Sequence, residues 1–169
     1  NVLPMLAMAA KNEGNNLCAI QCVGYALRYF GIKITDEQLR VEAEELGNLF
    51  SGGMPFGLVC ECIRHHGLNA QIITHCSVDL LRQYLSQKTV VIALVDGGEL
   101  IGDQETEQRE DLCKGFFPDH AIVIDSISER YITIRDSSTS QQLDTYPLPV
   151  FMDAWEDSKM TIVVVDAPN

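Results

Sequence analysis

Basic residues are scarce in this sequence. Its 169 residues include 12 lysines and arginines against 24 aspartates and glutamates, which gives a formal net charge of −12 at pH 7. A negative field of this size repels phosphate backbones and anionic membrane surfaces. We therefore expect no nucleic-acid partner.

Long apolar runs and Cys-x-x-Cys pairs are missing as well. The apolar start NVLPMLAMAA is too short to cross a bilayer and carries no basic residues before it. The six cysteines, at positions 18, 22, 60, 62, 76 and 113, are too sparse for a disulfide scaffold. We expect no membrane span, free thiols and action in a reducing compartment.

The composition otherwise fits one compact domain. Apolar residues make up 46% and charged residues 21%, and 169 residues can bury a core without disulfides or metals. Six of the acidic residues fall between Glu99 and Asp111, where Arg109 is the only basic residue. We predict a single domain over 1–169 with an acidic insertion at about 97–118, which is either a solvated loop or a docking surface for a basic partner.

Helical signals come first along the chain. Apolar residues at helical spacing through CAIQCVGYALRYFG predict a helix that begins at or just after Cys18 and stops at Gly31. A capping box, a proline in a first turn and a serine cap predict further helices over about 35–46, 55–66 and 77–85. Apolar, β-branched runs predict strands over 69–74, 89–96, 120–127, 130–136 and 160–166, with 89–96 central in the sheet. Helices followed by an antiparallel sheet describe an α+β fold.

Cys18 is the best candidate nucleophile in the sequence. A thiol in the first turn of a helix lies at the positive end of the helix dipole and near free backbone N–H groups, which favours the thiolate. Cys22, four residues later, continues the helix into the core, and we predict that it is a buried structural thiol.

A thiolate nucleophile needs a neighbouring imidazole, and His120 is the best candidate base. It begins the apolar strand HAIVIDSI, whereas His65 and His66 end a helix and His75 lies in a turn. Asp136 ends the next strand sixteen residues later, where adjacent antiparallel strands bring such termini side by side.

The sequence pattern identifies the oxyanion donors and a possible metal site less clearly than the triad. The backbone N–H of Cys18 can donate to an oxyanion, and a second donor can come from a side-chain amide upstream, at Asn12, Asn15 or Asn16. Cys60, Cys62, His65 and His66 could be combined into a metal site, but Cys-x-Cys in a helix points its thiols apart. We expect neither a metal nor a cofactor.

The arrangement resembles the bacteriocin-processing cysteine peptidases, papain-like domains that cut leader peptides after a double glycine in transporter-linked maturation systems. The resemblance covers nearly the whole chain and rests on Asn12, Cys18, Cys22, the Tyr29-Phe30-Gly31 ending and the spacing of His120 and Asp136. It departs at Asn12, where the family has Gln, at Ala19, where it has Gly, and at Ser137, where Pro often follows. The resemblance implies a papain-like fold with Cys18, His120 and Asp136 as the catalytic triad and Asn12 as an oxyanion donor.

A shorter segment, EGNNLCAIQC, is similar to the nucleophile segment of Josephin-type deubiquitinases. Both resemblances imply acyl chemistry on a protein or peptide, so we expect hydrolysis of a peptide or isopeptide bond by a free-standing effector or toxin domain. Two alternatives stay open. One is a glutamine deamidase that uses the same triad, and the other is an inactive papain-like binding module.

Overall fold

The computed structural model describes residues 18–47, 54–97, 100, 120–136 and 142–169. Within them the helices are α2 (Cys18–Tyr29), α3 (Asp36–Glu45), α4 (Phe56–His65), α5 (Val78–Leu85) and α8 (Leu148–Glu156). The strands are β1 (Asn69–Ile73), β2 (Val90–Val95), β3 (His120–Ile127), β4 (Tyr131–Asp136), β5 (Leu143–Pro147) and β6 (Ile162–Asp166). The predicted α+β class is confirmed.

The strands form one antiparallel sheet in the order β1-β6-β2-β3-β4-β5. The run 89–96 was predicted to be a central strand, and β2 lies inside the sheet with all six residues buried. A strand covered on both faces reads as a continuous apolar run, because neither face needs polar side chains. The last strand, β6, lies between β1 and β2, so β1 joins the rest of the sheet only through β6.

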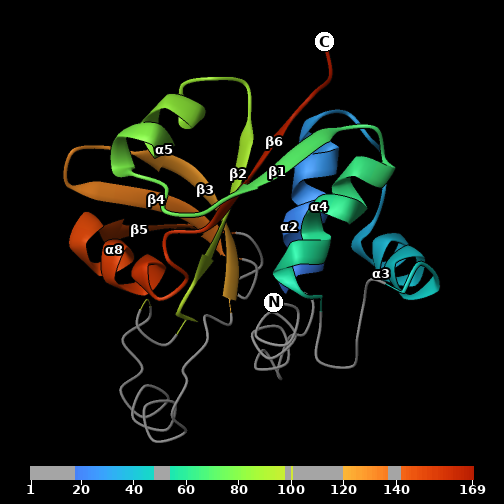
Figure 1. Ribbon diagram of the computed structural model, residues 1–169, viewed down its shortest axis with the longest axis horizontal. Coiled ribbons are helices and arrows are strands. Elements are labelled where there is room, and N and C mark those ends of the chain that lie inside the picture. Colours follow the sequence, from blue (N-terminus) through green and yellow to red (C-terminus); the bar gives the residue numbers. More distant parts are fainter. Residues whose placement is uncertain (1–17, 48–53, 98–99, 101–119, 137–141) are drawn as a thin grey trace, which may run out of the picture.

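Helices cover both faces of this sheet. Figure 1 shows α2, α3 and α4 together on one side and α5 and α8 on the other. Two apolar clusters follow from that division. In β3, Ala121 and Val123 pack into the cluster that holds α2 and α4, while Ile122 and Ile124 pack into the cluster that holds α8, as the period of two along a strand requires.

Local signals set the helix boundaries. The predicted capping box is present: Gln38 N donates to Thr35 Oγ1 at 3.0 Å and Thr35 N donates to Gln38 Oε1 at 2.9 Å. Ser77 Oγ accepts from Leu80 N at 3.0 Å at the start of α5. Gly31 and Gly67 both have φ of +87°, the left-handed conformation that ends a helix cheaply only at glycine.

The structure departs from expectation after β4. The segment 143–156 was not assigned an element, yet it forms the edge strand β5 and the helix α8. Its prolines explain the omission, since Pro147 and Pro149 read as breakers. Proline is well accommodated where α8 begins, because the first backbone N–H groups of a helix have no partner inside it.

Candidate active site

The first residue of α2 is Cys18, as predicted. Cys18 is 8% exposed and belongs to the apolar cluster that also includes Leu94 of β2 and Ala121 and Val123 of β3. The first backbone N–H groups of a helix lack partners within the helix and carry partial positive charge. Cys18 therefore presents a thiol where backbone donors and the helix dipole favour negative charge.

His120 is the first residue of β3 and is buried, with 8% of its surface exposed. Its backbone pairs with Val95, the last residue of β2. A histidine at the end of a strand in the middle of the sheet is held by ladders on rigid elements, which limits the directions its imidazole can take.

Asp136 is the last residue of β4, and its backbone pairs with Ile122 of β3. It is therefore a diagonal neighbour of His120 across the β3–β4 ladder, a relation in which the two residues lie about 7–8 Å apart. The sequence analysis expected the termini of two adjacent antiparallel strands to come side by side, and the strand pairing sets Asp136 opposite Ile122, two residues along β3 from His120.

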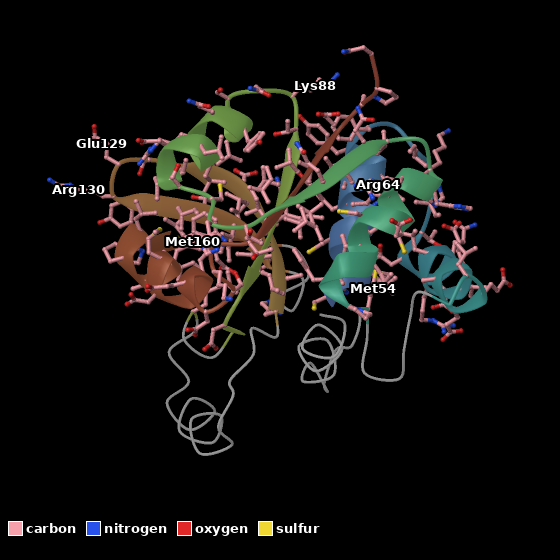
Figure 2. All side chains as sticks on the ribbon, viewed as in Figure 1. Met54, Arg64, Lys88, Glu129, Arg130 and Met160 are labelled. Carbon is pink, nitrogen blue, oxygen red and sulfur yellow. The ribbon has the colours of Figure 1, made fainter. Side chains whose placement is uncertain are left out.

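The ends of three elements lie at one end of the molecule. In Figure 1 the start of α2 and the start of β3 lie on the lower side, and α2 contacts β3; β4 ends next to β3, where Asp136 pairs with Ile122. The turn that joins β3 to β4 lies at the other end of the hairpin, where Figure 2 labels Glu129 and Arg130. A thiol, an imidazole and a carboxylate carried on these three ends have the chemical types needed for nucleophilic attack on an acyl carbon.

The expected oxyanion donors lie partly outside the described residues. Asn12, Asn15 and Asn16 belong to the segment before α2, which lies outside the described residues. Most of the acidic insertion at 97–118 lies outside them as well. Of the donors considered, the backbone N–H of Cys18 is the one that the described residues include.

The other described cysteines differ from Cys18 in their surroundings. Cys22 is 1% exposed, in the core as predicted, and Cys60 and Cys62 are each 2% exposed. Burial raises the pKa of Cys60, and it raises the pKa of Cys76 to about 11. Because the thiolate is the reactive form, a raised pKa disfavours reaction at Cys60 and Cys76.

The remaining histidines have structural partners. His66 was expected to cap the end of α4, and it occupies that cap position while its Nε2 lies 2.7 Å from Glu42 Oε1 of α3. His75 has a φ of +54°, and its backbone N–H donates to the carbonyl oxygen of Lys159 at 2.7 Å. Within the described ranges, no group of three or more histidine, cysteine or acidic residues is arranged to hold a metal ion.

Two features near these strand ends escaped the sequence analysis. Asp96 follows Val95 directly and is fully buried, with its backbone N–H donating to Ala154 of α8 at 2.9 Å. Its signal in the sequence was a charged residue at the end of an apolar run. Arg135, next to Asp136, lies over the ring of Tyr25 in α2. No local sequence pattern predicts that contact, because it joins residues far apart in the chain.

None of the helices that the structure describes is both long and apolar enough to span a membrane. The apolar start of the sequence lies outside the described residues.

Comparison with known proteins identifies the family. A model of the Peptidase_C39 like family matches residues 4–163. The peptidase domain of Streptococcus ComA, a bi-functional ABC transporter involved in a quorum-sensing pathway, aligns with a TM-score of 0.63 at 15% identity over 89% of this chain and 91% of that one. A C39-like peptidase from Bacillus anthracis aligns with a TM-score of 0.65 at 13% identity over 90% of this chain and 89% of that one.

No curated protein sequence matches the chain. At 13–15% identity the two structures establish the fold, and the family model carries the assignment. The resemblance to bacteriocin-processing peptidases and the papain-like α+β fold predicted from the sequence are both confirmed. The chain belongs to the Peptidase_C39 like family and is a papain-like cysteine peptidase.

Proposed function

We propose that this peptidase hydrolyses a peptide or isopeptide bond in a protein substrate, with Cys18 as nucleophile, His120 as general base and Asp136 as the residue that orients His120. The observation that supports this most is the register of β3 and β4 beside the start of α2. It sets the backbones of His120 and Asp136 in a diagonal pair across β3 and β4, and α2, which begins at Cys18, contacts β3.

The proposed reaction has two halves. His120 takes the thiol proton of Cys18 as the sulfur attacks the carbonyl carbon, and the resulting oxyanion is held by the backbone N–H of Cys18. Collapse breaks the bond to the leaving amine, which receives the proton from His120 and departs. Water, deprotonated by His120, then hydrolyses the thioester, and the thiol is restored.

Asp136 has a different task in this scheme. A carboxylate beside the imidazole selects one tautomer and stabilises the imidazolium that forms during the attack. The oxyanion needs more than one donor, and we propose that the side-chain amide of Asn12 supplies the second.

We further propose a protein substrate. A free-standing effector or toxin domain acts on a folded partner, and remote contacts to such a partner can be used to orient the reacting bond. The acidic insertion at 97–118 would supply those contacts in this scheme.

Intact mass spectrometry tests the proposal. Candidate proteins and a cell lysate are incubated with the wild type, with Cys18→Ala and with Cys22→Ala as the matched control. We expect new fragments or released ubiquitin-like chains with the wild type and Cys22→Ala, and none with Cys18→Ala.

Two other outcomes would replace the proposal. A gain of about one dalton without cleavage would identify a deamidase, because an amide becomes an acid. Identical spectra for wild type and Cys18→Ala, together with tight binding of a partner, would identify an inactive binding module.

A further inference from the structure

The guanidinium of Arg135 is fixed in place on the face of α2. Its Cζ atom lies 5.2 Å from the centroid of the Tyr25 ring. A guanidinium within about 6 Å of an aromatic centroid is attracted by the ring. The contact joins β4 to α2.

The N–H donors of Arg135 make few close contacts with acceptors within the described residues. Its Nη2 lies 3.4 Å from Asp125 Oδ1, and its buried Nε has no hydrogen-bond partner among them. In contrast, Arg28, Arg40 and Arg64 each donate hydrogen bonds of 3.2 Å or shorter. A guanidinium carries five N–H donors, so Arg135 keeps donors for a further acceptor.

This guanidinium lies within reach of a substrate at Cys18. Tyr25 follows Cys18 by seven residues, which places both on nearly the same helix face about 10 Å apart along the axis. An extended peptide rises about 3.3 Å per residue. A substrate bound along α2 would therefore pass Arg135 about three residues from the bond that Cys18 attacks.

Charge makes a carboxylate the fitting ligand. The planar fork of arginine matches a carboxylate in a bidentate way. The Arg135 side chain is 29% exposed, and its long contact to Asp125 leaves room for a closer acceptor. A chain with a net charge of −12 repels acidic peptides elsewhere, so a preference for acidic residues needs a local cation of this kind.

We propose that Arg135, held on Tyr25, binds a substrate carboxylate about three residues from the scissile bond and gives the peptidase a preference for aspartate or glutamate there. This inference rests on the proposed function. It makes Arg135 a specificity-determining residue and gives it no part in the bond-breaking step.

Mapping of new termini tests it. Lysate proteins are incubated with wild type, Arg135→Gln, Arg135→Lys, Arg135→Glu, Arg28→Gln and Cys18→Ala, and the new termini are sequenced by mass spectrometry. Arg28 is the matched control, since it lies on α2, as Tyr25 does, but donates to Asp36. Circular dichroism and melting curves show that each variant is folded.

We expect acidic residues to be enriched at the third or fourth position on one side of the cuts made by wild type and Arg28→Gln. Arg135→Gln should cut acidic sites about tenfold to a hundredfold more slowly, the effect of losing a hydrogen bond to a charged group. Arg135→Lys should keep a weaker acidic preference, and Arg135→Glu should shift it toward lysine and arginine.

The possible failures are distinguishable. Cuts without acidic enrichment in the wild type, or enrichment that survives in Arg135→Gln, would overturn the inference and leave the proposed function standing. If no new termini depend on Cys18, the proposed function fails and the inference fails with it. If Arg135→Gln does not fold, the comparison of Arg135→Lys with wild type decides the matter.

Discussion

Replacing His120 with alanine is expected to lower kcat/KM by about 10²–10⁴-fold, the contribution of a positioned general base. His120 is buried at the start of β3, and no other described histidine begins a strand at this end of the sheet. The substitution removes the group that accepts the Cys18 proton. Steady-state rates on any substrate found by the lysate experiment measure the loss.

Asp136→Ala should also give a folded protein with strongly reduced turnover, because an imidazole without its carboxylate samples the wrong tautomer. His66→Ala is the matched control, since His66 contacts Glu42 at the junction of α3 and α4. Its turnover should stay near that of the wild type. Equal losses in His66→Ala and Asp136→Ala, with circular dichroism unchanged, would remove the special status of the His120 and Asp136 pair.

Trp155→Ala is expected to have the largest effect on stability, lowering the free energy of unfolding by about 3–5 kcal/mol. Trp155 in α8 is fully buried, and its ring centroid lies 5.3 Å from that of Phe151. Its Nε1 donates to the carbonyl oxygen of Thr161 at 3.1 Å. The substitution leaves a cavity and removes the donor that ties α8 to the start of β6.

Urea unfolding of Trp155→Ala, Trp155→Phe and Val150→Ala measures this effect. Val150 lies in the same helix but is 36% exposed, so its truncation should be nearly neutral. Trp155→Phe keeps most of the apolar burial and should fall between the two. A loss in Trp155→Ala no larger than that in Val150→Ala would contradict the role of α8 in the second apolar cluster.

The sequence predicted the elements whose signals are local. The capping box at Thr35, the serine cap at Ser77 and the apolar run of β2 act over a few residues, and each has its predicted structure. The secondary structure of segment 143–156 was missed for a local reason too. Pro147 and Pro149 usually signal a break, but they also suit the start of α8.

Long-range features lay beyond the sequence. The pairing of β1 with β6 joins Asn69 to Asp166. The five residues of β1 have mixed burial, so their pattern does not indicate which strand they pair with. In β4 the alternation of Ile132 and Ile134 with polar residues is typical of a strand, and both isoleucines are buried. It could not show that Arg135, on the other face, meets Tyr25.

Candidate site residues were easier to find than their geometry. Cys18, His120 and Asp136 stood out because each is a reactive type at the end of a predicted element, and each does lie at an element end. Asp96 was included in the predicted strand 89–96 as its last residue and was given no role in the site. It is fully buried, and its backbone N–H donates to Ala154 of α8, a helix that the sequence analysis did not assign.

Alkylation of the native protein tests the central claim most directly. Wild type and His120→Ala are treated briefly with iodoacetamide at neutral pH, and the modified cysteines are mapped by mass spectrometry. We predict that Cys18 is the fast-reacting thiol in the wild type and that it reacts markedly more slowly in His120→Ala, because the imidazole promotes the thiolate. If Cys60, Cys76 or Cys113 is alkylated first while Cys18 stays unmodified, or if His120→Ala leaves the Cys18 rate unchanged, the proposed nucleophile and base are wrong.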